Sequence, residues 1–503
     1  MVLTSNQLKS YTLLEIESLL QVHGKSLDNY KEMPKSDRGL VADVQNRLIY
    51  DELNYNRNIL VEEHRNLMTT MTDEQRGVYD RILSRVHTNK PRFFFVYGYG
   101  GTGKTYIWRS LSAALRSAGH IVLTVASSGI AALLIPGGRT AHSRFGIPLS
   151  VDELSSCEIK PKCPLGQLIV KTKLIIWDEA PMMHKHCFEA LDRTLRDVMK
   201  SFNNGRMDIP FGGKVVVLGG DFRQILPVLP KGTREEITQA TVNFSHLWNY
   251  VEVLTLTANM RLSTGSSDSD IHERKLFSDW ILAIGDGSVG ESNDVDIRVE
   301  IPPDLLLRSN GNPLAAIVNS TYPNLLQNID DLSYFQDRAI LAPKNAIVDE
   351  VNNYMMDLMP GEEKIYLSYD SPLYPKSGNN SSDEVHTPEF LNTISTSRIP
   401  NHKLRLKVGV PVMLLRNIDH NLGLCNGTRL VITKMGKYVL EGKVISGTNI
   451  GQKVYIPRLS LVPSDKKMPI KFQRRQFPLA VSFAMTINKS QGQSLKHVGV
   501  YLP

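Results

Sequence analysis

Short apolar runs alternate with helix-compatible segments between residues 71 and 260. The runs are four to six residues long and rich in Val and Ile, which is typical of strands buried on both faces of a parallel sheet. We therefore expect an α/β domain with helices on both sides of the sheet and its ligands beyond the carboxyl ends of the strands. The five candidate strands are Phe93–Tyr97, Ile121–Ala126, Leu174–Trp177, Val215–Leu218 and Val253–Leu256.

The first 70 residues have a different pattern. Leucine and isoleucine recur at helical spacing between Leu13 and Leu20, and a second helical stretch is expected from about Val41 to Met68. No chemistry is evident in residues 1–70, so we interpret them as a helical N-terminal segment that serves packing.

A second α/β unit is expected over residues 291–503, after a first domain at 71–290 that ends near the polar loop Ser263–Asp270. One of its strands is predicted at Arg338–Pro343. Short strands and turns at about 404–475 predict a small, SH3-like β-barrel inserted in this unit. Lys376–Glu384 is expected to be a flexible insertion.

Composition adds only broad limits. The net charge of +7 permits a polyanionic partner without proving one. The four cysteines have no C-x-x-C spacing, so reduced thiols are expected, and His184 and His186 are interpreted as an exposed polar turn, with metal binding a distant alternative. We find no apolar stretch of membrane-spanning length and no apolar signal core at the N-terminus, which favours the cytosol or nucleus and no membrane partner.

A glycine-rich stretch, Gly98-Tyr-Gly-Gly-Thr-Gly-Lys104-Thr105, follows the first candidate strand and precedes a helical segment. Strand, glycine-rich turn and helix form the context of a phosphate-binding loop, in which backbone N–H groups surround a polyphosphate. Lys104 would reach the β and γ phosphates, and the Thr105 hydroxyl would hold Mg²⁺. The remaining phosphate-binding candidates are Gly98, Gly100, Gly101, Thr102 and Gly103.

Two carboxylates end the candidate strand Leu174–Trp177. Asp178 is the candidate Mg²⁺ ligand, and Glu179 is the candidate for polarising an attacking water. A solvated acidic pair at a strand end is the alternative, and it is weak because the pair lies downstream of a phosphate-binding loop.

Other polar residues follow further strands. Gln224, after the run at 215–218, is expected to sense the γ-phosphate or orient water, whereas Arg223 is slightly favoured as an ordinary salt-bridge partner. Arg261, after the run at 253–256, would neutralise charge in the transition state, although an isolated arginine is more often a surface residue. The amide of Gln75 suits an adenine edge, but alone it is very weak evidence.

Taken together, these motifs resemble those of the Pif-type DNA helicases, a branch of helicase superfamily one that also includes RecD. The resemblance covers roughly residues 70–503, and the ordered set is specific where each motif alone is not. The matching elements are Asp73–Gln75, Gly98–Thr105, Ala126–Ala132, Gly138–Phe145, Asp178–Met182, Gly220–Gln224, Asn259–Arg261, Leu341–Asn345 and Phe483–Ser494.

The resemblance implies two RecA-like parallel-sheet domains with ATP and Mg²⁺ bound between them. It implies an ATP-dependent DNA helicase that moves 5′ to 3′ on single-stranded DNA, opens junctions and uses no other small molecule. By similarity, Gln75 contacts the adenine base, and Lys104 and Thr105 hold the phosphates and Mg²⁺. Asp178 and Glu179 act on the metal ion and the attacking water. Gln224 and Arg261 sense the γ-phosphate, and Gly492 and Gln493 face the nucleotide.

The same resemblance implies a DNA track across the top of both domains. His142, Ser143 and Phe145 match the strand-contacting element of the first domain. A ring such as Phe145 would stack a base, with core packing about equally expected. Asn345, Thr486 and Lys489 are the matching residues in the second domain, and the segment near 148–172 occupies the place of the strand-separating wedge.

The amino-acid sequences of these motifs most resemble the helicase portion of plant Helitron transposons. Their nuclease motif is not matched by His184-Lys-His186, so we expect no nuclease here. A nuclear monomer acting in DNA repair, recombination or telomere maintenance is the inherited expectation.

The family's pattern continues beyond Val498–Pro503 into a helix with an arginine that reaches the γ-phosphate. An alternative expectation is therefore an ATP- and DNA-binding module with weak turnover. A small-molecule kinase is a third interpretation, which leaves the second α/β unit unexplained.

Overall fold

The computed structural model describes residues 5–22, 26–27, 30, 32–35, 46–203, 209–262, 268–289, 299–309, 311–373, 387–394, 399–419, 422–447, 449–463 and 470–502. The expected insertion Lys376–Glu384 and most of the loop Ser263–Asp270 lie outside these residues.

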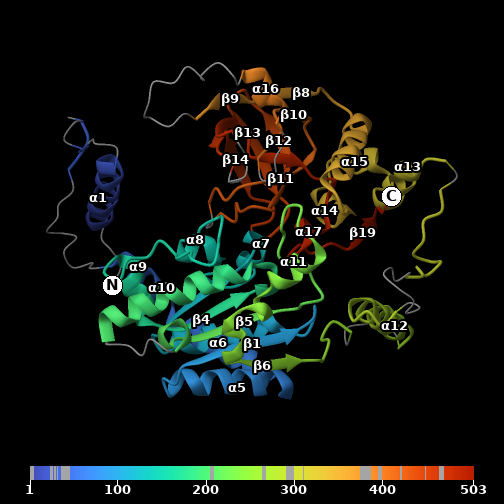
Figure 1. Ribbon diagram of the computed structural model, residues 1–503. Coiled ribbons are helices and arrows are strands. Elements are labelled where there is room, and N and C mark those ends of the chain that lie inside the picture. The colour runs from blue at the N-terminus through green and yellow to red at the C-terminus, as the bar shows by residue number, and fades with distance from the viewer. Residues whose placement is uncertain are drawn as a thin grey trace.

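Six parallel strands form the first sheet, in the order β3-β2-β4-β5-β1-β6 (Figure 1). All five strands expected from the sequence are present, each within a few residues of its predicted limits. The strands are β1 (Arg92–Gly98), β2 (Ile121–Ala126), β3 (Arg139–Thr140), β4 (Thr172–Asp178), β5 (Val215–Gly220) and β6 (Val251–Leu256).

Helices cover both faces of this sheet, as expected. Successive strand residues point to opposite faces, so Phe94 and Val96 pack toward α5 (Asp73–His87) and α6 (Lys104–Ser117). Their neighbours on β1 pack with the opposite core, which contains side chains of α9 (Pro164–Lys171) and α10 (Lys185–Asn203). The remaining short helices of this part are α7 (Gly129–Leu133), α8 (Ala141–Phe145), η2 (Ala180–Met182), η3 (Pro210–Gly213), α11 (Arg234–Gln239), η4 (Val242–Phe244) and η5 (His246–Tyr250).

The N-terminal segment contains helices in both of the expected stretches, but the stretch expected from about Val41 to Met68 is divided into α3 (Arg47–Leu53) and α4 (Arg57–Thr70), and its part around α3 docks on the first domain. Asn46 caps α3 by accepting hydrogen bonds from two backbone N–H groups, and its own amide donates to the Pro164 carbonyl of α9 at 2.7 Å. Helix α1 (Ser5–Val22) precedes them, and α12 (Asp268–Gly285) follows the first sheet.

A second, smaller parallel sheet has β7 at its centre, between β18 and β19. The strand predicted at Arg338 is therefore confirmed. The elements of this unit are β7 (Arg338–Ala342), β18 (Ala484–Thr486), β19 (His497–Val500), α13 (Pro313–Thr321), η6 (Leu325–Gln327), α14 (Leu332–Gln336), α15 (Asn345–Leu358) and α17 (Ile487–Ser490).

Antiparallel sheets are inserted between β7 and β18, as expected, but they use more of the chain than 404–475. The largest has the order β14-β13-β12-β11-β17, and two smaller sheets pair β10 with β8 and β16 with β15 and β9. The strands are β8 (Lys364–Leu367), β9 (Tyr369–Pro372), β10 (Lys403–Leu406), β11 (Pro411–Leu414), β12 (Arg429–Met435), β13 (Val439–Val444), β14 (Lys453–Pro457), β15 (Leu459–Leu461), β16 (Phe472–Gln476) and β17 (Leu479–Val481), with the short helix α16 at Pro388–Thr393.

Buried polar side chains join these sheets to the second parallel sheet. The fully buried Arg429 of β12 donates to the carbonyl of Arg338 on β7 at 3.1 Å and to that of Ser482 at 3.2 Å. Asn352 of α15 exchanges hydrogen bonds with the backbone of Ala484, the first residue of β18. These bonds satisfy backbone groups at the junction and fix the inserted sheets on the domain.

His184 and His186 do not form an exposed turn. Both are half-buried at the start of α10, and Nδ1 of His186 lies 2.7 Å from a carboxylate oxygen of the buried Glu189. Burial lowers the pKa of His184 to about 4, so its ring is neutral near pH 7. Within the described residues no group of three or more His, Cys, Asp or Glu side chains is arranged to hold a metal ion, and no helix is long and apolar enough to cross a membrane.

Candidate nucleotide site and DNA-facing residues

The glycine-rich loop lies between β1 and α6 and has the backbone conformation that its glycines permit. Gly101 and Gly103 have φ values of 97° and 87°, in the left-handed region that favours glycine. A Cβ at Gly101 would lie 2.2 Å from Oδ1 of Asn259, so this glycine also allows the loop after β6 to approach. Gly103 caps α6, which leaves the N–H groups of its first turn available to a phosphate.

Lys104 is buried, and its ammonium group turns back into the loop. Nζ donates to the carbonyl oxygen of Gly98 and lies 3.5 Å from that of Tyr99. Thr105 is half-buried in the first turn of α6. Both residues therefore lie at the carboxyl edge of the sheet, where the sequence predicts a phosphate-binding loop.

Gln75 contacts the loop itself. It is buried, its Oε1 accepts from the Thr72 backbone N–H at 3.2 Å, and its Nε2 donates to the Thr102 carbonyl at 3.1 Å. The first bond belongs to the capping box that starts α5. In this structure the amide therefore supports the loop, and an adenine would have to compete for the same atoms.

The two carboxylates at the end of β4 occupy different environments. Asp178 is buried, and its Oδ1 has no hydrogen-bond partner among the described residues. Burial raises its pKa, and the charge of Lys104 opposes that effect. Glu179 follows in the left-handed region, with φ 52°, and burial together with the charge of Asp178 raises its pKa to about 7.

The residues after β5 lie beside this acidic pair. Asp221 is buried and accepts a hydrogen bond from the backbone N–H of Arg223 at 3.0 Å. The Arg223 side chain pairs with Asp286 at 2.7 Å and lies over the ring of Tyr97, so the salt-bridge interpretation of this arginine is confirmed. Asp221 was missed by the sequence analysis, although its place after an apolar strand was the available signal.

The loop after β6 reaches the glycine-rich loop from the other side. The Met260 backbone N–H donates to the Gly101 carbonyl at 2.9 Å, and a Cβ at Gly101 would lie 3.3 Å from Cγ of Arg261. The exposed Arg261 therefore lies close to the phosphate-binding loop. The expected juxtaposition of the residues after β1, β4, β5 and β6 is present.

The second unit reaches this edge through Gln491 rather than through the two residues named from the sequence. Nε2 of Gln491 donates to Oε1 of Gln224 at 3.3 Å. A Cβ at Gly492 would lie 3.0 Å from Ile130 of α7, and the Gln493 amide donates to the Gly427 carbonyl at 2.8 Å. Gln493 thus binds the inserted antiparallel sheet in this structure, and Gln491 was missed.

The expected DNA-contacting residues of the first unit lie on α8. Ser143 is exposed and His142 is half-buried. Phe145 is fully buried, with its ring centroid 6.2 Å from that of Trp177 on β4. The suggestion that Phe145 stacks a base is therefore corrected: its ring belongs to the core below α8.

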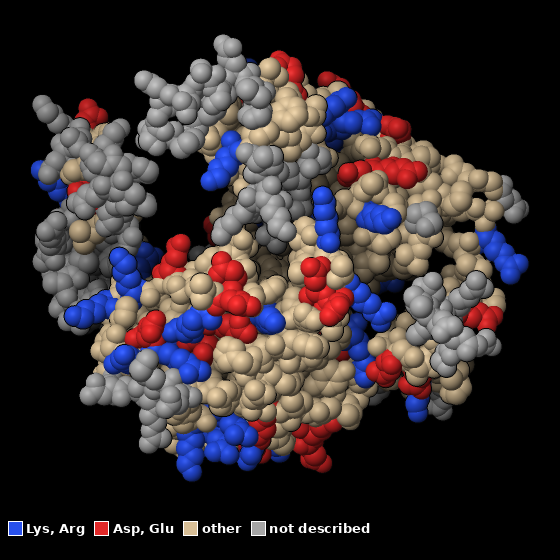
Figure 2. Space-filling view, viewed as in Figure 1, with Lys and Arg blue, Asp and Glu red and all other residues tan. Residues whose placement is uncertain are grey.

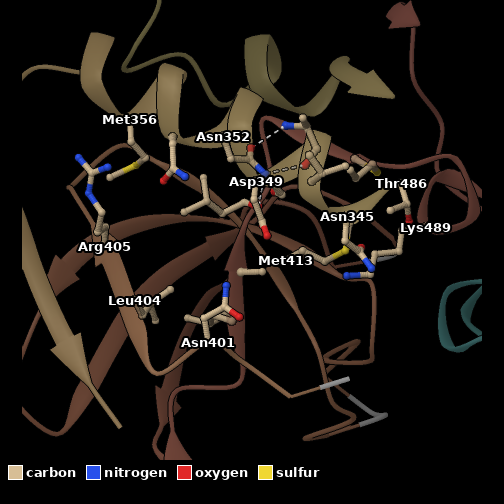
Figure 3. A pocket seen from close by; sticks show the side chains of 18 of the residues that line it. Asn345, Asp349, Asn352, Met356, Asn401, Leu404, Arg405, Met413, Thr486 and Lys489 are labelled. Carbon is tan, nitrogen blue, oxygen red and sulfur yellow. Dashed lines mark hydrogen bonds between the residues drawn. The ribbon is translucent and has the colours of Figure 1, made fainter. Parts of the chain in front are cut away.

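Asn345, Thr486 and Lys489 come together on one side of a cavity of about 310 Å³ in the second unit (Figure 3). Figure 3 shows Arg405 and Met356 at the opposite side, with Asp349 and Asn352 between. The cavity is lined by polar side chains; the charge of Lys489 interacts with that of Asp349, and the guanidinium of Arg405 is paired with Asp357 and Glu363. Figure 2 shows basic and acidic side chains interspersed on the visible face, so net charge alone does not locate such a site.

Comparison with known proteins gives two family matches. Residues 70–295 match the PIF1-like helicase model, and residues 389–435 match the model of the 2B domain of DNA helicase Pif1. The longer of the two matches covers a little under half of the chain.

Individual relatives agree with these matches. The chain is 27% identical over 442 residues to the ATP-dependent DNA helicase PIF1 of Xenopus laevis, with 86% of this chain and 57% of that protein covered. It is 37% identical over 331 residues to the ATP-dependent DNA helicase PIF4 of Trypanosoma brucei brucei, with 57% of this chain and 36% of that protein covered. The chain therefore spans little more than half the length of the curated Xenopus relative.

The fold has a counterpart of known structure. Pif1 helicase from Bacteroides, in complex with ADP-AlF3 and ssDNA, aligns with a TM-score of 0.56 and 22% identity over 86% of each chain. This likeness concerns the arrangement of the parallel and antiparallel sheets. The chain is therefore similar to PIF1-like helicases over residues 70–295 and to the 2B domain of DNA helicase Pif1 over residues 389–435.

Proposed function

We propose that this chain couples ATP hydrolysis to 5′-to-3′ movement along single-stranded DNA and thereby separates duplex strands. The observation that carries the proposal is the convergence at one sheet edge of the glycine-rich loop, the pair Asp178–Glu179, Gln224 and the loop of Arg261, with Gln491 reaching the same edge from the second unit. The relatives named above are ATP-dependent DNA helicases, which supports it.

In this proposal Lys104 and the loop residues Gly98–Thr105 bind the ATP phosphates. Thr105 and Asp178 fit Mg²⁺, because a hydroxyl and a buried carboxylate with an unpartnered Oδ1 are the oxygen ligands that this ion prefers. When bound, Mg²⁺ neutralises phosphate charge. In the nucleotide-free protein, the positive charge of Lys104 favours the ionised form of Asp178.

Glu179 would accept the proton of the attacking water, since its pKa of about 7 is suited to a general base near neutral pH. Gln224 would orient that water or the γ-phosphate, and Arg261 would stabilise the charge that develops on it. Gln75 would contact adenine only after giving up a bond seen here, and Gly492 and Gln493 would face the nucleotide only after leaving their present contacts.

Two RecA-like units at 71–290 and 291–503 would then move relative to each other as ATP binds and leaves. DNA would cross His142 and Ser143 on the first unit and Asn345, Thr486 and Lys489 on the second. The polarity of the cavity and the exposure of Ser143 support this track. The segment near 148–172, with its exposed Leu149 and Leu154, would serve as the strand-separating wedge.

The cellular role proposed for the chain is inferred from the amino-acid sequences of its motifs. We place it in the nucleus, as a monomer related to Helitron-type transposon helicases, with roles in repair, recombination or telomere maintenance. Junctions between single-stranded and double-stranded DNA are the proposed substrates.

ATP hydrolysis with and without single-stranded DNA tests the proposal. The unaltered chain is expected to hydrolyse ATP faster when DNA is added, and Lys104→Ala to hydrolyse none, because the substitution removes the cation beside the phosphates. Lys90→Ala, which changes an exposed lysine before β1, is the matched control and should behave like the unaltered chain.

Forks with either a 5′ or a 3′ single-stranded tail then test polarity. Unwinding that requires the 5′ tail supports the assignment. ATP hydrolysis that ignores DNA would contradict the helicase proposal, and DNA binding with hydrolysis no faster than Lys104→Ala would instead favour a binding module with weak turnover.

A further inference from the structure

The outer surface of β12, β13 and β14 gathers lysines and a tyrosine. In the strand register Lys443 lies opposite Lys453, and Glu441 lies opposite Tyr455 on one side and Lys434 on the other. We name these five residues the basic face. It is on the antiparallel insertion, outside the residues assigned above to nucleotide or DNA.

The alternation of side chains fixes which residues form this face. Leu440 and Val444 of β13 and Val454 and Ile456 of β14 are buried in the core of the second unit. Residues between them must point the other way, because successive strand residues alternate between the two faces of a sheet. Of these outward-pointing residues, Lys453 and Tyr455 are exposed, Tyr455 with 63% of its surface, whereas Lys443 is half-buried and Glu441 is buried beneath its neighbours.

The lysine pair on this face is unfavourable in the isolated protein. Like charges directly opposite each other on neighbouring strands repel, with strands only about 4.8 Å apart. The one carboxylate of the face is already engaged: Glu441 accepts from the Thr433 hydroxyl at 2.8 Å and lies 3.7 Å from Nζ of Lys434. Hydrogen bonding by Thr433 and the charges of Lys434 and Lys453 hold the pKa of Glu441 below its ordinary value.

An anion placed between Lys443 and Lys453 would remove this repulsion. The exposed aromatic rings narrow the choice of anion. Tyr455 flanks the lysine pair on β14, and Tyr438, 70% exposed, lies at the turn into β13 with Nζ of Lys437 5.3 Å from its ring centroid. Lysines beside exposed rings suit a ligand that has both phosphates and unpaired bases.

We propose that the basic face is a second binding surface for single-stranded DNA, separate from the track across α8 and the cavity of Lys489. Phosphates bind at Lys443 and Lys453, and a base stacks on Tyr455. The proposal rests on the proposed function in one respect, that single-stranded DNA is the ligand of this protein. It adds a second site, on the antiparallel insertion, at which a further stretch of single-stranded DNA binds.

The test compares oligothymidylates of two lengths, a short one that fills only the track and a longer one of about 30 nucleotides, by fluorescence anisotropy over a series of salt concentrations. The variants are the double substitution Lys443→Ala with Lys453→Ala, and Tyr455→Ala. Matched controls are Lys90→Ala with Lys231→Ala, two exposed lysines of the first unit, and Tyr369→Ala, an equally exposed tyrosine on β9.

For the long oligonucleotide, the double lysine variant is expected to lower the slope of log affinity against log salt by about 1.4, since each phosphate contact to a single strand contributes about 0.7. Tyr455→Ala is expected to bind it roughly five- to a hundredfold more weakly, the usual effect of losing one base stack. Affinity for the short oligonucleotide, and the ATP hydrolysis it stimulates, should remain unchanged.

Slopes and affinities equal to those of the controls would overturn the proposal. Equal losses on both oligonucleotides would also overturn it, because the face would then belong to the main track. If the short oligonucleotide fails to stimulate ATP hydrolysis by the unaltered chain, the proposed function is contradicted. The salt dependence of binding to the long oligonucleotide would still show whether the basic face binds single-stranded DNA.

Discussion

Glu179 combines a constrained backbone with a perturbed side chain. Its left-handed φ of 52° is uncommon for a residue with a side chain, and strain of this kind gathers at functional sites. Burial and the neighbouring Asp178 raise its pKa to about 7, whereas the charge of Lys104 opposes the shift. A carboxylate that is half-ionised near pH 7 has the proton affinity required of a general base.

The pH dependence of kcat/KM for ATP tests this role, because that parameter reports the ionisation of the free enzyme. We expect kcat/KM to rise with pH through about 7, as Glu179 loses its proton. Glu179→Gln should lower kcat about 10²- to 10⁴-fold, the usual contribution of a general base, while ATP still binds. The exposed Glu362→Gln is the control.

Stability gives an independent measurement of the same ionisation. The folded state binds the Glu179 proton more tightly than a free carboxyl of pKa 4.5 does, so its contribution to the free energy of unfolding falls between pH 4.5 and about 7. Glu179→Gln should remove that fall in the nucleotide-free protein. An unchanged pH profile in both measurements would contradict the raised pKa.

Single residues also show where sequence inference stops. The position of Asp178 and Glu179 at the carboxyl edge of the sheet was predictable because they directly follow an apolar strand. Phe145 was not, since its motif gives no sign of which way the ring points, and it packs near Trp177. Gln491 was missed because its partner, Gln224, is 267 residues away along the chain.

Among the elements, α3 has a defined structural role that its sequence did not reveal. Its Glu52 is buried and pairs with Arg144 of α8, and Arg116 of α6 lies 3.9 Å from the same carboxylate. The ring of Tyr55, just after α3, lies 4.5 Å from the guanidinium carbon of Arg116. The N-terminal segment therefore neutralises arginines beneath α8, the helix that bears His142 and Ser143.

Removing this carboxylate should destabilise the protein. Glu52→Ala leaves buried arginines without their counter-charge, which typically costs about 3–5 kcal/mol, and urea unfolding would measure it. Asp51→Ala, which breaks an exposed pair with Arg47, should cost about 0–1 kcal/mol. The double variant Glu52→Leu with Arg144→Leu should recover part of the loss, and a cost for Glu52→Ala no larger than the control would contradict the role of α3.

Strands were predicted correctly where a continuous run of apolar residues in the sequence is also buried in the structure. The strands of the first sheet are continuous apolar runs because both of their faces are covered. β8 and β9 were missed because Leu367 and Tyr369 are exposed and because these short strands pair with β10 and β16, which are far from them along the chain. The expected limits of 404–475 were too narrow for that reason.

At the scale of the whole molecule, described residues of the two units contact each other beside the candidate nucleotide site. Gln491 binds Gln224, while Gly492 lies against Ile130 of α7 and leaves no room for a Cβ without movement of that side chain. Gly427 of the inserted sheets also lies against Ile130, and Gln493 holds the Gly427 carbonyl. A change at the ATP phosphates can therefore reach both the second unit and its antiparallel insertion through adjacent contacts.

Among these contacts, the hydrogen bond between Gln491 and Gln224 involves Gln224, the residue proposed to sense the γ-phosphate. If it transmits the nucleotide state, Gln491→Ala should reduce the factor by which a non-hydrolysable ATP analogue changes DNA affinity. By thermodynamic reciprocity, the factor by which DNA changes affinity for the analogue must shrink equally. Affinity for the analogue without DNA should stay the same, because Gln491 is not proposed to bind nucleotide.

Titrations of each ligand in the presence and absence of the other measure both factors. Gln239→Ala, which removes an exposed amide on α11, is the control and should leave both factors unchanged. The allosteric coupling between sites is typically about 1–3 kcal/mol, so a loss of one hydrogen bond worth about 1 kcal/mol should be readily detected. If the coupling factors of Gln491→Ala equal those of the control, the Gln491–Gln224 hydrogen bond does not transmit the nucleotide state. The contact of Gly492 with α7 would then be the candidate path between the units.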